Sequence, residues 1–96
     1  MTSKQRAYLR GLANTLDSKY QFGKNDLAQP FLDQIDAALE ANELIKITVL
    51  ETALLTPRQL CDALCEKLGA HGVQVIGWKV VLYRESQNKK RIELPK

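Results

Sequence analysis

Segments with helical periodicity alternate along this chain with short segments that have strand character. Apolar residues recur at helical spacing in three stretches, at about residues 3–15, 28–41 and 57–68. Short apolar or alternating runs lie between and after these stretches, at about residues 19–22, 44–50 and 73–84. The last run divides near Gly77, so the order of elements is αβαβαββ. Because a helix with one apolar stripe buries that stripe against a sheet, this order predicts an α/β two-layer sandwich with the helices packed on a four-stranded mixed sheet.

Turn and cap signals mark the third helix and the final pair of strands. Thr56 is a suitable N-cap, Pro57 fits the first helical position, and Gln59 has the spacing of a capping box. Gly77 lies inside an otherwise apolar run. A glycine in that position favours a bend or a bulge between the last two strands over a two-residue hairpin turn.

The length and the apolar pattern indicate one domain. Ninety-six residues suffice for a single hydrophobic core, so we expect one domain over residues 1–96. Its core is expected at about 3–84, and the basic tail at 85–96 is expected to be mobile around Lys89, Lys90 and Arg91. The longest apolar stretches are too short for a transmembrane helix, and the polar start lacks a secretory signal. We therefore expect a cytoplasmic protein without a membrane partner.

Charge is distributed unevenly along the chain. The net charge is +3, with about +4 in residues 1–24, −6 in residues 25–66 and +5 in residues 67–96. If the two basic ends meet in space, they form one positive face, which is the electrostatic pattern of a nucleic-acid-binding protein. The alternative is a solvated surface on which the charges cluster by chance.

The residues that usually carry catalysis are sparse. His71 is the only histidine and is expected in a surface loop, next to no obvious nucleophile. Cys61 and Cys65 lie four residues apart on the apolar face of the third helix, a spacing that is poor for a disulfide and insufficient for a metal site. They are interpreted as buried free thiols. There is also no phosphate-binding glycine motif of the nucleotide-binding enzymes, so we expect a protein that is not an enzyme, with no metal, no cofactor and no small-molecule substrate.

A glycine–lysine corner joins the first strand to the second helix. Gly23 permits a close approach of the backbone, and Lys24 supplies a positive charge beside Asn25. The N–H groups at the start of the following helix point towards any anion bound there. Asp26 places a carboxylate in the same corner, and its charge opposes a phosphate. The corner is interpreted as a weak phosphate-binding signal or a plain strand-to-helix turn.

Basic and aromatic residues elsewhere add candidates for nucleic-acid contact. The bases fall on the first helix and on the strands: Lys4, Arg6, Arg10, Lys46, Lys79 and Arg84. On a helix such a group grips phosphates or simply faces solvent, and on a strand each base must reach solvent or a ligand. Trp78 and Tyr83 have side chains that stack on unpaired bases. For Trp78 a core position is favoured, whereas for Tyr83 the two interpretations are equally weighted.

These motifs, in this order, resemble the CRM domain, a family named for chloroplast RNA splicing and ribosome maturation, and most of all its free-standing bacterial YhbY-like members. The resemblance spans about residues 3–84 and is carried by Lys4-Gln5-Arg6 with Tyr8–Ala13, Phe22-Gly23-Lys24-Asn25, Glu43–Ile47, and Val75-Ile76-Gly77 leading to Leu82-Tyr83-Arg84. It implies a fold similar to the C-terminal domain of bacterial translation initiation factor three. It also implies a non-enzymatic, RNA-binding role in maturation of the large ribosomal subunit, on ribosomal RNA in a precursor particle.

The resemblance also implies which residues bind. Family members have a Gly-x-x-Gly loop like that of KH domains, which clamps the nucleic-acid backbone. Gly23, Lys24 and Asn25 match that loop, and Asp26 replaces its second glycine. The basic residues of the first helix, Lys46 and Arg84 carry over as RNA-binding positions, and Lys79 is added from its place on a strand.

A second hypothesis comes from another class of protein. The acidic outer face of the second helix, at Asp33, Asp36 and Glu40, or an exposed sheet edge, would serve a ribosome-associated adaptor that binds protein without touching RNA. Nothing in the sequence requires a dimer, so a monomer is expected.

Overall fold

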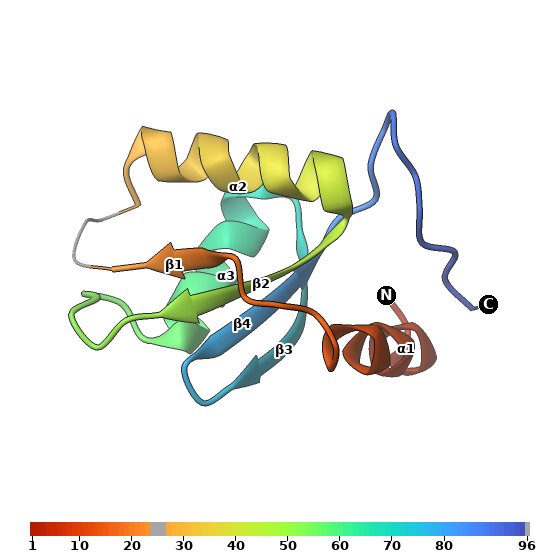
Figure 1. Ribbon diagram of the computed structural model, residues 1–96, viewed down its shortest axis with the longest axis horizontal. Helices are drawn as coiled ribbons and strands as arrows, with labels where there is room; N and C mark the ends of the chain where they lie inside the picture. Colours follow the sequence, from red (N-terminus) through yellow and green to blue (C-terminus); the bar gives the residue numbers. More distant parts are fainter. Residues whose placement is uncertain (24–26, 96) are drawn as a thin grey trace.

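In the part of the chain that the structure describes, three helices and four strands follow one another in the order expected from the sequence (Figure 1). The computed structural model describes residues 1–23 and 27–95. Its elements are α1 (Ser3–Ala13), β1 (Tyr20–Phe22), α2 (Gln29–Asn42), β2 (Leu44–Val49), α3 (Pro57–Leu68), β3 (His71–Ile76) and β4 (Lys79–Tyr83). The αβαβαββ order is confirmed, and α3 begins with the predicted capping box; α1 begins with a second one, formed by Thr2 and Gln5.

The four strands form one mixed sheet in the order β1-β2-β4-β3. β1 runs parallel to β2, with Tyr20 opposite Ile47, and β4 pairs antiparallel with both β2 and β3. The parallel pair requires a crossover connection, which α2 provides. The α/β sandwich with a four-stranded mixed sheet is therefore confirmed.

The main core lies between the sheet and the helices α2 and α3. Period-two alternation turns Ile45, Ile47 and Val49 of β2 towards these helices, and all three are buried. Leu39 of α2 and Leu64 of α3 meet them from the other layer and are fully buried. This cluster is the apolar layer that the sequence periodicity predicts.

The first helix packs on the opposite face of the sheet. Leu9 and Ala13 of α1 form a second buried cluster with Leu44, Val81 and Tyr83. Figure 1 shows α1 at one end of the molecule, away from the end where β1 leads into the grey segment. The helix thus covers only one end of this face, and the strand residues beyond it form an open half of the sheet.

The last two strands are joined by a two-residue turn at Gly77 and Trp78, so the prediction of a bend or bulge at this glycine is wrong. Gly77 has a φ of +56°, which suits the first position of a tight hairpin loop that begins with glycine. The register irregularity between β3 and β4 lies earlier, between Gly72 and Gln74.

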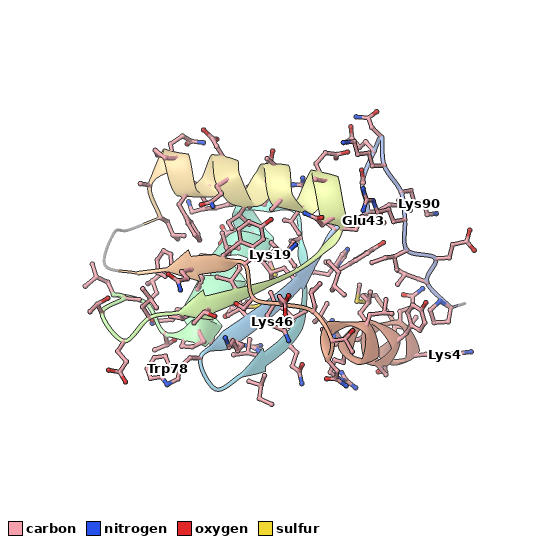
Figure 2. The ribbon with its side chains drawn as sticks, in the orientation of Figure 1. Lys4, Lys19, Glu43, Lys46, Trp78 and Lys90 are labelled. Carbon is pink, nitrogen blue, oxygen red and sulfur yellow. The ribbon has the colours of Figure 1, made fainter. Side chains whose placement is uncertain are left out.

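The C-terminal tail is held against the body of the protein, and the expectation of a mobile tail is wrong. Glu43, which is fully buried, accepts hydrogen bonds from the backbone N–H groups of Ser86, Arg91 and Ile92. Glu40 accepts from the Ser86 hydroxyl and from two further backbone N–H groups of the tail. Figure 2 shows Glu43 at the end of α2, close to the segment of the tail that carries Lys90.

These contacts set the titration of both carboxylates. Hydrogen bonds from the Ser86 hydroxyl and the tail backbone lower the pKa of Glu40 below its ordinary value. Burial acts to raise the pKa of Glu43, but the three backbone N–H groups outweigh it, so that this pKa is also lowered. Both groups therefore stabilise the fold in their ionised form.

We expect the protein to lose stability as the pH falls below about 4.5, the ordinary pKa of these carboxyls. A carboxyl with a lowered folded-state pKa is protonated first in the unfolded chain, so its contribution is complete above the unfolded pKa and is lost as the pH falls through the folded one. Denaturant titrations between pH 7 and pH 3 measure this slope. Glu43→Gln removes one titrating group and is expected to flatten it; an equally steep slope in that variant would contradict the assignment to Glu43.

Candidate nucleic-acid interface

The open half of the sheet carries lysines and neutral polar residues. Strand register places Gln21, Thr48, Lys79 and Ile76 side by side in one row that crosses all four strands. The neighbouring row contains Lys46, Val81 and Gln74. Among the described strand residues that point to this face, none is Asp or Glu. The described strand residues of these two rows therefore contribute two positive charges and no negative charge.

A hydroxyl network positions one of these lysines. Lys79 Nζ donates to Thr48 Oγ1 at 2.7 Å, and Thr48 Oγ1 lies 2.6 Å from Ser18 Oγ. The ammonium group is thereby held over the middle strands, and Thr48 is the one hydrogen-bond partner that the described residues provide for it. Lys46 lies in the centre of this face in Figure 2. The polar members Gln21, Thr48 and Gln74 were missed by sequence reasoning, although the alternation that exposes Lys46 also applies to them.

The three basic residues of α1 differ in their surroundings. Arg6 is half-buried and its Nε donates to the Gly72 carbonyl at 3.1 Å, which ties the helix to the edge strand β3. Arg10 lies in the last turn of α1 and is half-exposed. Lys4 is exposed at the first turn, and Figure 2 shows it at the end of the molecule opposite Trp78. Lys4 therefore lies apart from Lys46, and Arg6 is engaged by the backbone of β3.

The glycine corner begins at the end of β1, where the chain passes close to β2. Leu50 N–H donates to the Phe22 carbonyl, and a Cβ added to Gly23 would lie 3.1 Å from Leu50 Cδ1. A larger residue at position 23 would therefore have to displace the Leu50 side chain by a few tenths of an ångström. Lys24, Asn25 and Asp26 lie outside the described residues.

The helix that follows the corner starts without a side-chain cap among residues 1–23 and 27–95. Its N-cap is Ala28, which has no polar side chain, whereas Thr2 and Thr56 cap α1 and α3. Among the described residues, no side chain therefore caps the positive end of this 14-residue helix.

Arg84 has internal partners. Its guanidinium donates to the Asp36 carboxylate at 2.7 Å, to the Asp36 carbonyl and to the Leu68 carbonyl. The predicted acidic outer face of α2 is present, with Asp33 and Asp36 exposed, but two of its acids also have partners: Asp36 pairs with Arg84 and Glu40 binds the tail. These acids link α2 to β4 and to the tail.

The two aromatic candidates separate. Tyr83 is 3% exposed and belongs to the cluster beneath α1, where it is stacked against His71. Trp78 is 52% exposed, so the favoured prediction of a core position for it is wrong. His71 lies at the start of β3 instead of in a loop, and it is exposed.

The groups that usually carry chemistry are dispersed in the described part of the chain. Cys61 and Cys65 are free, as expected; Cys61 is buried, and burial raises the pKa of its thiol to about 11. No group of three or more His, Cys, Asp or Glu residues within residues 1–23 and 27–95 is placed to hold a metal ion. Across the same residues, none of the helices combines the length and the apolar character that a membrane crossing needs.

A hollow of about 480 Å³ runs along the edge strand β3, lined by Arg6, Arg58, Cys61, Cys65 and Gln74 among others. Gly72 forms its floor, where an added Cβ would lie 2.9 Å from Cys61 Sγ. The hollow lies between α1 and α3, beside the open face.

Fold and site together define a class of protein: a small α/β sandwich domain with a basic sheet face that its helices leave open. The CRS1 / YhbY (CRM) domain matches residues 1–84. The chain belongs to this CRS1 / YhbY family, as the sequence motifs imply.

Relatives cover the chain from end to end. It is 40% identical over 95 residues to "Probable RNA-binding protein YqeI" of Bacillus subtilis, with 99% of each chain covered. It is 36% identical to an RNA-binding protein of Haemophilus influenzae, covering all of this chain and 96% of that one. The solution structure of a Staphylococcus aureus protein described as a candidate RNA-binding protein is similar, with a TM-score of 0.81, 43% identity and 99% of both chains covered. The family and these relatives are described as RNA-binding proteins and not as enzymes.

Proposed function

We propose that this protein binds RNA through the open face of its sheet, and that its target is ribosomal RNA in a precursor of the large ribosomal subunit. The observation that carries RNA binding is the row of Thr48, Lys79 and Gln21 beside Lys46, a face whose described strand residues include two lysines and no Asp or Glu, in a chain whose relatives are named RNA-binding proteins. The ribosomal target rests on the resemblance to the bacterial YhbY-like proteins.

The corner after β1 extends this proposed interface. Gly23, with Lys24 and Asn25, precedes α2, whose N-terminus has no side-chain cap among the described residues. Such a helix start accepts phosphate oxygens through its backbone N–H groups. Arg10 is kept as a contributor from α1. Arg84 is left out of the proposed contact surface because its guanidinium is engaged by Asp36 and Leu68, and Arg6 and Lys4 are assigned to its periphery.

We expect binding to be governed mainly by phosphate contacts, and therefore to weaken as salt is added. For single-stranded RNA the logarithm of the association constant should fall against the logarithm of salt concentration with a slope of about −0.7 per phosphate contacted. Anisotropy titrations of a labelled RNA between 50 and 300 mM salt measure this slope. A slope near zero, or no binding at 50 mM salt, would contradict the proposal.

Association with ribosomal particles tests the finer part of the proposal. The protein is expected to sediment with large-subunit precursors, and Arg10→Glu is expected to weaken that association without altering the circular dichroism spectrum. An adaptor that binds only protein, by contrast, would remain on the particles after Arg10→Glu. Such an adaptor would use the acidic outer face of α2 or an exposed edge of the sheet.

A further inference from the structure

The only tryptophan of the chain stands at the tip of the β3–β4 turn with about half of its surface exposed. Its neighbour two residues earlier, Ile76, is 58% exposed and lies opposite Lys79 in the register of the two strands. Figure 2 shows Trp78 projecting from the lower edge of the sheet, away from both termini. A large aromatic and a large aliphatic side chain exposed together have no role in the described cores.

The turn that carries Trp78 is fixed against the rest of the sheet. The Trp78 carbonyl accepts from Val49 N–H at 2.7 Å, beyond the last paired residues of β2 and β4. The backbone N–H of the next residue, Leu50, donates to the Phe22 carbonyl, and the Leu50 side chain lies beside Gly23. Three consecutive contacts therefore place the tryptophan and the glycine corner at the same end of the sheet.

Charge beside the tryptophan favours an anionic partner. Lys79 follows Trp78 directly, and its ammonium group points along the open face to Thr48. The adjacent positions on that face are Gln21, Thr48, Gln74 and Lys46, with no carboxylate among the described strand residues there. A protein partner that covered Trp78 and Ile76 would have to bury Lys79 as well, whereas a nucleotide would pair its phosphate with the same lysine.

We propose that Trp78 is a stacking platform for one unpaired base of the bound RNA, with Lys79 receiving the adjacent phosphate. The inference rests on the proposed RNA binding and adds a preference to it. In a duplex the faces of the bases are covered by their neighbours, so only a single-stranded or unpaired nucleotide can lie on the indole. Ile76 extends the apolar surface beside the ring.

The single tryptophan makes the stacking directly observable. A fluorescein-labelled 12-nucleotide single-stranded RNA and a duplex of the same sequence are titrated by anisotropy, and indole emission is followed in parallel with the unlabelled RNAs. We expect the single strand to quench the indole emission along the same isotherm that anisotropy reports. The duplex should bind with little quenching.

Substitutions give the expected size of the effect. Loss of one base–aromatic stack corresponds to about a 5- to 150-fold rise in Kd, so Trp78→Ala should weaken single-strand binding within this range and leave duplex binding unchanged. Trp78→Phe should retain most of the affinity. Leu54→Ala, which removes a side chain that is 70% exposed in the β2–α3 connection, is the matched control and should bind as the wild type does.

The outcomes separate the two proposals. If the single strand binds without quenching and Trp78→Ala changes Kd by less than about twofold, the platform is overturned while RNA binding stands. Equal losses in Trp78→Ala and Leu54→Ala also overturn it, because they indicate a general dependence on exposed apolar surface. If neither RNA binds the wild-type protein, both proposals fail. If a variant does not fold, the quenching measured with the wild-type protein still tests whether Trp78 stacks on a base.

Discussion

Replacing Glu43 with alanine is expected to lower the free energy of unfolding by roughly 2–4 kcal/mol. The carboxylate accepts three backbone N–H groups from the tail, and a buried donor left without its acceptor costs about 1–3 kcal/mol. The tail then loses its anchor, and Ile92 and Leu94 no longer pack against the cluster around Leu9. Domains of this size have about 5–15 kcal/mol of stability in total, so the loss is readily measured by urea denaturation.

The backbone at Glu43 provides a matched comparison. This residue has φ +67° and ψ −46°, an unfavourable conformation for any residue with a Cβ. Glu43→Gly removes the same carboxylate but relieves the backbone, so it should be less destabilised than Glu43→Ala. Hydrogen exchange of the Arg91 and Ile92 amides should accelerate in both variants. Unchanged protection of these amides, or alanine stability within about 0.5 kcal/mol of wild type, would contradict the anchoring role.

The elements of the fold were predictable because their signals are local. Ile45, Ile47 and Val49 alternate with polar residues, and this alternation alone gives β2 and the face that it buries. Thr56 and Gln59 form the predicted capping box at the start of α3. Each of these patterns is read within a few residues of sequence and needs no knowledge of the partner that it meets.

Contacts between distant residues could not be predicted in the same way. Glu43 binds amides that lie 43 to 49 residues further along the chain, and its positive φ has no sequence signal in a non-glycine residue. Arg84 meets Asp36 across 48 residues, so a base that was predicted to reach RNA is engaged within the fold. A core position was favoured for Trp78, but it lies in the two-residue turn between β3 and β4, where it is 52% exposed.

The sequence predicted which strands carry the basic residues of the candidate site, but not which of these residues lie together. The sequence places Lys46 and Lys79 on strands. They lie in adjacent rows of the sheet only because the strand order β1-β2-β4-β3 brings β4 beside β2. The same topology separates these lysines from Lys4 at the far end of α1. Strand order is set by the packing of helices on the sheet, so it follows from the fold as a whole and from no single segment.

Replacing Lys46 and Lys79 together with alanine is expected to weaken RNA binding by about 25- to 60-fold at 0.1 M salt. Each phosphate contact releases about 0.7–0.9 of a counterion, which corresponds to a factor of about 5–8 at this salt concentration. The slope of the logarithm of affinity against the logarithm of salt should become shallower by about 1.4–1.8. Neither lysine supports a buried polar group alone, since Thr48 Oγ1 keeps its contact with Ser18, so the fold should be retained.

A second double variant separates the open face from the total charge. Lys67→Ala with Lys89→Ala removes the same two charges from exposed positions in the last turn of α3 and in the tail. If the interface lies on the open face, this variant should keep the wild-type salt slope, because contacts are lost only where phosphates sit. Equal losses in both double variants would mean that RNA responds to the net charge of +3 and not to this surface. A loss confined to Lys46 and Lys79 would assign the phosphate contacts to the face that α1 leaves uncovered, next to the turn that carries Trp78.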